Sequence, residues 1–239
     1  MTAAAERELV VVGAGGFGRE TVEAVRALNA TGARWRLAGY LDDDPARHGT
    51  LIDGVPVLGG TEELGNMPDA SVVVCTGRPG NYVSRPRIVE ALCLPPERYA
   101  TIIHPSASVS TTSRVGPGSV LLAQTVLTAA VTVGSHVAIM PHVVLTHDDT
   151  IGDFATLASG ACLGGGVSVG RCAYLGAGAL VRERCSVGCG ALVGMGAVVT
   201  RDVPADEVWA GVPARYIREA AVANAALSTS GRSGRRGEK

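Results

Sequence analysis

The sequence has few aromatic residues, almost no net charge and no long apolar run. Aromatic residues make up 4% of the 239 residues, and the formal net charge at pH 7 is −1. A net charge this small argues against a protein that binds nucleic acid. No apolar stretch approaches the roughly 20 residues of a membrane-spanning helix, and residues 1–8 lack the basic start and apolar core of a signal peptide. We therefore expect a cytoplasmic protein that binds neither nucleic acid nor membrane.

The cysteines form no CxxC pair and show no zinc-binding spacing. They stand at positions 75, 93, 162, 172, 185 and 189. In a reducing compartment such cysteines are free thiols that serve as small side chains. The sequence predicts no metal site.

What the sequence has instead is a six-residue period from Val109 to Val199. Every sixth residue in this stretch is aliphatic, sixteen times without a slip. Glycine follows the aliphatic residue at 116, 134, 152, 164, 170, 176, 188 and 194, and a small residue stands four positions after it at 113, 119, 155, 161, 173, 179, 191 and 197. Neither a 3.6-residue helix nor an alternating strand has this period. It is typical of a parallel β-helix built from hexapeptide repeats.

Each hexad is expected to form one side of a triangular coil, so three hexads close a turn and sixteen make about five coils. The aliphatic residue points into the prism, and the small residue lies where the interior is narrow. We expect the glycine to relax the backbone at or near a corner. Each coil buries its apolar side chains only against its neighbours, so stability adds up along the stack.

Alternating strand and helix signals before the repeat predict a small parallel sheet covered on both faces. The expected strands are 9–12, 35–41, 71–75 and 99–103 with a short edge strand at 55–58, and helices are expected at 19–28, from 61 and at 82–92. The fold class is thus a Rossmann-like α/β domain (1–104) followed by a β-helix (105–217). Residues 218–239 are expected to form a short Ala-rich helix and a disordered basic tail.

A glycine-rich turn follows the first predicted strand. Gly13, Gly15 and Gly18 match G-x-G-x-x-G between a strand and a helix, a pattern that lets the backbone approach a phosphate at the helix N-terminus. About one hundred residues precede the repeat, which leaves room for one mononucleotide half and excludes a complete dinucleotide site. A nucleoside diphosphate attached to another group is favoured, and the alternative is a tight turn without a ligand.

Taken together, these features resemble the sugar O- and N-acyltransferases of the sialic-acid and bacillosamine pathways (NeuD/PglD type), from Leu9 to about Ile217. The markers are the glycine-rich turn, Tyr40-Leu-Asp-Asp43, His104-Pro-Ser-Ala107, Thr146-His-Asp-Asp-Thr-Ile-Gly-Asp-Phe154 and Gly211-Val-Pro-Ala-Arg215. The resemblance implies a left-handed β-helix, a homotrimer with acetyl-CoA in grooves between prisms, and a nucleotide-linked sugar on the N-terminal domain.

The resemblance assigns His147 and Asp148 to the catalytic pair. Acetyl transfer needs a base that takes a proton from the acceptor, and histidine suits this role near neutral pH. A neighbouring carboxylate fixes the tautomer of the imidazole. Without the resemblance, four other histidines compete equally: His48, His104, His136 and His142.

The resemblance also assigns the two binding sites. The acceptor residues are Gly13, Gly15, Gly16, Phe17, Gly18, Asp42, Asp43 and Met140. The acetyl-CoA residues are Ala155, Gly164, Gly165, Gly176, Ala177, Arg201 and Arg215. A backbone N–H near Gly164 and Gly165 is expected to stabilise the oxyanion, and the two arginines either reach the CoA phosphates or are plain surface residues. Phe17, Met140 and Ala155 stand where relatives often have polar residues, which leaves the acceptor open.

The sequence therefore predicts an acetyl-CoA-dependent transferase, without a metal, that acts on the amine of a nucleotide-linked amino sugar. One alternative is O-acylation, or acylation of another small molecule in a specialised pathway. Another is a non-catalytic trimeric scaffold whose N-terminal domain binds a nucleotide.

Overall fold

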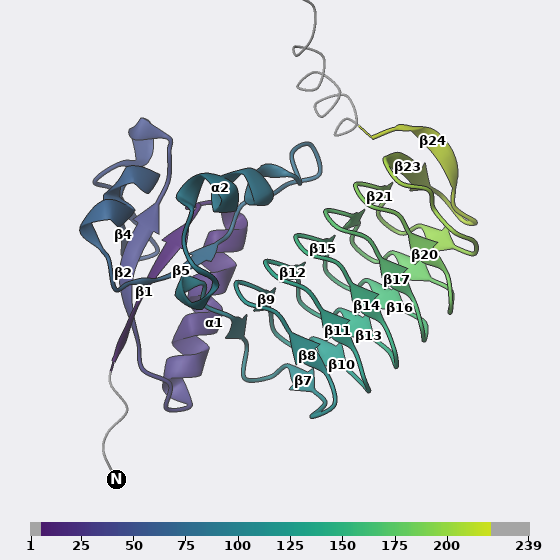
Figure 1. Ribbon diagram of the computed structural model, residues 1–239, viewed down its shortest axis with the longest axis horizontal. Coiled ribbons are helices and arrows are strands. Elements are labelled where there is room, and N and C mark those ends of the chain that lie inside the picture. Colours follow the sequence, from purple (N-terminus) through teal and green to yellow (C-terminus); the bar gives the residue numbers. More distant parts are fainter. Residues whose placement is uncertain (1–5, 221–239) are drawn as a thin grey trace, which may run out of the picture.

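The computed structural model describes residues 6–220, which form an N-terminal α/β domain and a prism of short parallel strands (Figure 1). The stack of coils runs away from the α/β domain to a hairpin at its far end. The predicted helix at 219–227 and the tail lie outside the described residues, apart from Glu219, which ends β24, and Ala220, which follows it. Among the described residues, no helix is long and apolar enough to cross a membrane.

The N-terminal sheet has the strand order β3-β4-β2-β1-β5. Its strands are β1 Arg7–Val12, β2 Trp35–Leu41, β3 Leu51–Ile52, β4 Val55–Gly59 and β5 Ser71–Val74. All neighbours are parallel except β3 and β4, so β4 is not the predicted edge strand. The helices are α1 Gly16–Ala30 and α2 Ser84–Leu92, with 3₁₀ helices η1 Pro45–Arg47, η2 Thr61–Asn66 and η3 Pro96–Arg98.

Alternate residues of β1 face opposite sides of this sheet, as a strand requires. Leu9 and Val11 are buried with residues of α1, whereas Val10 and Val12 are buried with residues of α2 and η2. The continuous apolar run of β1 is therefore explained by burial on both faces, and the predicted two-sided cover is confirmed.

The prism has three faces, each a parallel sheet. Face 1 contains β6 Ile102–Ile103, β9 Val120–Leu121, β12 Ala138–Ile139, β15 Thr156–Leu157, β18 Tyr174–Leu175, β21 Leu192–Val193, β23 Glu207–Ala210 and the antiparallel β24 Arg215–Glu219. Face 2 contains β7 Ser108–Val109, β10 Val126–Leu127, β13 Val144–Leu145, β16 Cys162–Leu163, β19 Leu180–Val181 and β22 Val198–Val199. Face 3 contains β8 Arg114–Val115, β11 Thr132–Val133, β14 Thr150–Ile151, β17 Ser168–Val169 and β20 Ser186–Val187.

The aliphatic residue of each hexad points into the prism. From Leu121 to Val199 these residues are all nearly inaccessible, and each pairs with the residue eighteen positions away. Trp209 closes the far end of this core. The predicted phase and direction of the repeat are confirmed.

Two expectations about local structure are wrong. The repeated glycines do not relax the backbone, because none of the eight has a positive φ. They are required for close approach between coils: a Cβ on Gly152 would lie 2.7 Å from the backbone nitrogen of Arg171. The left-handed residues stand two positions later, for example Phe154 at φ 61°. Of the strand expected at 99–103, only Tyr99 pairs with the N-terminal sheet, through a single parallel bridge to Val72 of β5, whereas Ile102–Ile103 pairs with β9 and starts face 1 of the prism.

Candidate active site

The glycine-rich turn opens a cavity of about 460 Å³ at the carboxyl edge of the N-terminal sheet. The turn follows β1 and leads into α1, with Gly15 as the N-cap residue. Residues after three neighbouring strands line the cavity: Gly13, Gly15, Gly16 and Phe17 after β1, Asp42, Asp44 and Arg47 after β2, and Cys75, Thr76, Gly77 and Arg78 after β5. Exposed helix N–H groups and the dipole of α1 make this edge suited to a phosphate.

The glycines of the turn have different roles. A Cβ at Gly15 or Gly16 would meet no atom within 4 Å, so the space beside both is open to a ligand. A Cβ at Gly18 would overlap the carbonyl oxygen of Gly13, and Gly13 itself has φ 103°. Gly18 therefore permits close packing of the turn rather than clearance for a phosphate.

Asp42 shapes the turn as well as lining the cavity. Its carboxylate accepts a hydrogen bond from the N–H of Ala14 at 2.9 Å and from that of Asp44 at 3.1 Å. Arg47 lies 3.5 Å from Asp42 and donates to the carbonyl of Ala14 at 3.0 Å. Arg47 and Arg78 were missed by the sequence prediction, although both follow carboxyl ends of parallel strands, where anionic ligands bind.

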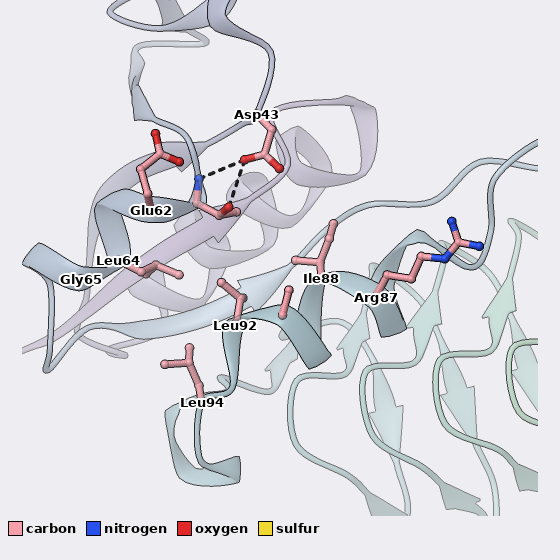
Figure 2. Close-up of a pocket in the computed structure, with 10 residues that line it drawn as sticks. Asp43, Glu62, Leu64, Gly65, Arg87, Ile88, Leu92 and Leu94 are labelled. Carbon is pink, nitrogen blue, oxygen red and sulfur yellow. Dashed lines mark hydrogen bonds between the residues drawn. The ribbon is translucent and has the colours of Figure 1, made fainter. Parts of the chain in front are cut away.

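Asp43 points to a second cavity, about 540 Å³, between η2 and α2 (Figure 2). Its carboxylate accepts hydrogen bonds from the N–H and hydroxyl of Thr61 at 3.0 and 3.1 Å. Leu64, Leu92 and Leu94 give this cavity an apolar wall. Ile88 lines both cavities, so the two adjoin.

His147 stands at the corner between faces 2 and 3, after β13. Its Nδ1 lies 2.8 Å from the Asp148 carboxylate, and both side chains are about two-thirds exposed, at 68% and 67%. With Nδ1 bonded to the carboxylate, Nε2 is free to accept a proton. The corner turns sharply because Asp148 has φ 65°.

Gly165, one coil further along the same corner, lies directly under the imidazole. A methyl group at Gly165 would overlap the ring of His147. The carbonyl of His147 accepts the N–H of Gly166 at 2.8 Å, which joins the two coils here. The N–H of Gly165 has no hydrogen-bond partner within residues 6–220, so a donor remains beside the imidazole for a developing oxyanion.

The other histidines have different surroundings. His136 is buried against the ring of Phe154, at 5.0 Å between ring centroids, and burial lowers its pKa to about 4. His48 contacts the Asp42 carbonyl and His104 contacts Ser106. His142 is exposed at the corner between faces 1 and 2. Among the described residues, only His147 has a carboxylate on its ring.

The predicted acetyl-CoA residues do not gather on one surface of a single copy. Gly164 and Gly165 accompany His147, and Arg201 lies further along the same corner, with its guanidinium 5.2 Å from the Trp209 ring centroid. Gly176 and Ala177 lie at the corner between faces 1 and 2. Ala155 is fully buried inside the prism, so its side chain is not available to a ligand. Arg215 belongs to β24, where it donates to the Ala214 carbonyl at 2.8 Å.

Face 1 of the prism lies against the N-terminal domain of the same chain. Buried Arg85 of α2 donates to the carbonyl oxygens of His136 and Phe154 at 3.1 and 2.8 Å. A small cavity of about 160 Å³ separates Phe17 of the glycine-rich turn from Met140 and Ala177. His147 is at the corner opposite face 1, so one copy does not bring it together with the turn.

Comparisons with known proteins agree with both halves of the chain. The model of the PglD N-terminal domain matches residues 8–92. The acetyltransferase domain of PglB from Neisseria gonorrhoeae is 31% identical, with 89% of this chain and 100% of that chain covered and a TM-score of 0.77. PerB from Caulobacter crescentus, solved with CoA and GDP-perosamine, is 30% identical, with 89% and 98% covered and a TM-score of 0.78.

A curated relative matches over a shorter stretch. The UDP-N-acetylbacillosamine N-acetyltransferase of Bacillus subtilis is 33% identical over 122 residues, which are 49% of this chain and 52% of that protein. The chain thus matches about half the length of this relative.

The shared architecture is a Rossmann-like domain joined to a left-handed parallel β-helix, as the sequence predicted. With matches of at least 30% identity over nearly the full length of solved relatives, the chain belongs to the PglD/NeuD-type family of sugar acyltransferases.

Proposed function

We propose that the protein transfers an acetyl group from acetyl-CoA to the amine of a nucleotide-linked amino sugar, with His147 as the general base. The observation that carries this proposal is the His147–Asp148 pair over Gly165, with Nε2 of the imidazole free and an unpaired N–H beside it. PglB of Neisseria gonorrhoeae has been solved with acetyl coenzyme A, and PerB with CoA and GDP-perosamine. Two further structures, of a perosamine N-acetyltransferase and a GDP-perosamine N-acetyl transferase from Caulobacter crescentus, carry an Asn or an Ala in place of a histidine.

The chemistry follows from these groups. The acceptor nitrogen attacks the thioester carbonyl while Nε2 of His147 takes a proton from the amine. Negative charge develops on the carbonyl oxygen, where the N–H of Gly165 is a suitable donor. The tetrahedral intermediate then expels the CoA thiolate, to which the imidazolium returns the proton. Asp148 keeps the proton on Nδ1 and stabilises the imidazolium.

The acceptor's nucleotide is proposed to bind in the cavity at the glycine-rich turn. Its phosphates would meet the N-terminus of α1 with Arg47 and Arg78, which supply positive charge. The sugar would then extend past Phe17 toward the small cavity beside Met140. That path ends at the corner between faces 1 and 2.

A second copy is needed to bring His147 to this path, and the outer surface of the prism supports a homotrimer. The outward residues of face 3 are polar or charged, whereas those of face 2 are apolar after Ser108 in its first strand: Val126, Val144, Cys162, Leu180 and Val198. If face 2 of each copy turns toward a threefold axis, the corner carrying His147 adjoins the neighbour's corner between faces 1 and 2. Each site then combines one copy's turn and its neighbour's imidazole.

Replacing Leu180 by arginine is expected to break the trimer. Leu180 is 46% exposed in one copy, and in the proposed assembly a charge there would be buried without a partner. Light scattering should show monomers for Leu180→Arg at micromolar concentration. The matched control is Ser168→Arg on the outward side of face 3, which should remain trimeric. A wild-type protein that is monomeric while active would contradict the assembly.

Free thiols fit a reaction in the cytoplasm. All six cysteines are unpaired in the structure, as is usual in a reducing compartment. We therefore propose a cytoplasmic location for the transfer.

Thiol release from acetyl-CoA, measured with a panel of UDP-, GDP- and dTDP-linked amino sugars, tests the proposed function. Release that depends on an amino sugar, with an amide product, is expected. An ester product would instead identify an O-acyltransferase. Tight nucleotide binding without release for any acceptor would favour the scaffold.

Replacing Gly15 by valine is expected to weaken acceptor binding about tenfold or more and to leave acetyl-CoA binding unchanged. The Cβ of the new side chain meets no protein atom within 4 Å and lies in open space beside the turn, so we expect the side chain to compete with the ligand. A loss of one hydrogen-bonded phosphate contact corresponds to roughly 1.5–3 kcal/mol. Calorimetry with each ligand separates the two affinities. An equal loss of both would contradict the site assignment.

A further inference from the structure

Asp149 is a fully buried carboxylate at the corner that carries His147. It occupies the inward-facing position where the repeat otherwise has small or apolar residues. Along the same corner the equivalent residues are Ser113, Val131, Val167 and Cys185. Within this column of the described coils, Asp149 is the only charged residue, and it lies in the coil that carries His147. It belongs to neither of the two proposed binding sites.

The two carboxylate oxygens of Asp149 join two neighbouring coils. Oδ2 accepts the N–H of Thr146 at 2.8 Å, and Oδ1 accepts the N–H of Val167 at 2.8 Å. Thr146 directly precedes His147, and Val167 follows the Gly165–Gly166 segment. One side chain therefore fixes both the segment that carries the imidazole and the segment that lies under it.

Burial of this carboxylate works against the stability of the fold. Desolvation raises the pKa of Asp149 to about 6, although the N–H groups of Val167 and Thr146 and the nearby His147 favour the ionised form. Among the described residues, no lysine or arginine is paired with it. Valine fills the same position in the coils before and after, so the prism does not require a carboxylate here. A residue that departs from the pattern of the repeat at a cost in stability is typical of a functional site.

We propose that Asp149 is a positioning residue that holds the His147 imidazole over Gly165. This inference rests on the proposed function, because it assumes that the imidazole takes the acceptor's proton. Without the carboxylate, the N–H groups of Thr146 and Val167 lose their acceptors and the two segments separate. The imidazole then loses its fixed direction relative to the N–H of Gly165.

Asp149→Val tests the proposal, because it installs the residue that the adjoining coils already have. The expected result is a fall in kcat of about 10–100-fold, since a small misplacement of a reacting group has this effect. KM for both substrates should change less than threefold, and Tm should not fall. Asp149→Asn keeps one acceptor oxygen and should recover part of kcat.

The pH dependence of kcat/KM distinguishes a positioning role of Asp149 from a role in stability alone, because a purely structural residue would leave it unchanged. The titratable groups that bear on Asp149 are His147 and Asp148. Removal of a negative charge beside the imidazole disfavours the imidazolium. The acid limb of kcat/KM should therefore move to lower pH in Asp149→Val.

Ser113→Val is the matched control. Ser113 stands in the same column two coils earlier, and its hydroxyl accepts the N–H of Val131 at 3.1 Å. This substitution removes an equivalent hydrogen bond far from His147 and should leave kcat unchanged. An equal loss of kcat in Ser113→Val, or wild-type kcat in Asp149→Val, would overturn the proposal.

A crystal structure of Asp149→Val separates this proposal from the proposed function. If the wild type transfers acetyl to no acceptor, the proposed function fails, and the position of the ring still decides the role of Asp149. A ring displaced from Gly165 supports the positioning role. A ring that stays in place overturns it.

Discussion

Replacing His147 by alanine is expected to lower kcat by roughly 10²–10⁴-fold, the range that general-base catalysis supplies. The affinity for acetyl-CoA should change little, because the imidazole acts on the acceptor's proton in the transition state and does not hold the donor. Single-turnover kinetics with acetyl-CoA binding measured by calorimetry checks both statements. Asp148→Asn should have a smaller effect, since it leaves the base in place.

His142→Ala is the control for this prediction. His142 is exposed at a different corner of the prism, so its removal should leave turnover near normal. In the wild type, kcat/KM should fall toward acid pH because an imidazolium cannot accept a proton. Near-normal turnover of His147→Ala with loss of activity in His142→Ala would mean that the base is one hexad away.

Replacing Arg85 by methionine is expected to destabilise the protein by about 3–5 kcal/mol, more than any surface substitution. Arg85 is 1% exposed, and burial lowers the pKa of its guanidinium to about 10, so it is charged at neutral pH. Its five donated hydrogen bonds end on the carbonyl oxygens of Thr76, His136, Phe154 and Ala155 and on the hydroxyl of Thr156. Methionine fills much of the space but leaves these buried acceptors without the donor.

Urea unfolding of Arg85→Met measures this loss. The control is Arg87→Met on the same helix, because Arg87 is exposed and makes no hydrogen bond within the described residues. Its midpoint should stay within error of the wild type. Equal midpoints for Arg85→Met and the wild type would show that the buried guanidinium does not hold the α/β domain to the prism.

The prism was predictable because every hexad repeats one environment. An aliphatic residue every six positions has the same neighbours in each coil. The phase of the repeat therefore predicts which side chains are buried and that residues eighteen positions apart pair with each other. The role of the repeated glycines was not predictable, since it depends on distances between coils. For the same reason Ile102–Ile103 was assigned to the wrong sheet: a two-residue strand carries no signal of its partner.

Only those parts of the candidate site whose residues are neighbours in the sequence could be predicted. His147 and Asp148 are adjacent, and the glycine-rich turn is continuous, so motif and spacing describe them. Arg85 and Asp149 have no such signal, because their partners lie in other coils or in the other domain. Nor does any pattern in the sequence reveal that His147 lies on the side of the prism away from the turn of its own chain.

Each site is proposed to combine the glycine-rich turn of one copy with His147 of the next, and mixed trimers of two impaired variants, assayed at an acceptor concentration well below KM, distinguish this arrangement from a site within one chain. His147→Ala and Gly15→Val chains, each with its own tag, are coexpressed, and trimers that contain both are purified. In every such trimer one of the three sites joins an intact turn to an intact His147, so about one third of wild-type turnover is expected. If the turn and the histidine of the same chain worked together, no site would be intact, and the mixed trimers would be no more active than the Gly15→Val variant alone.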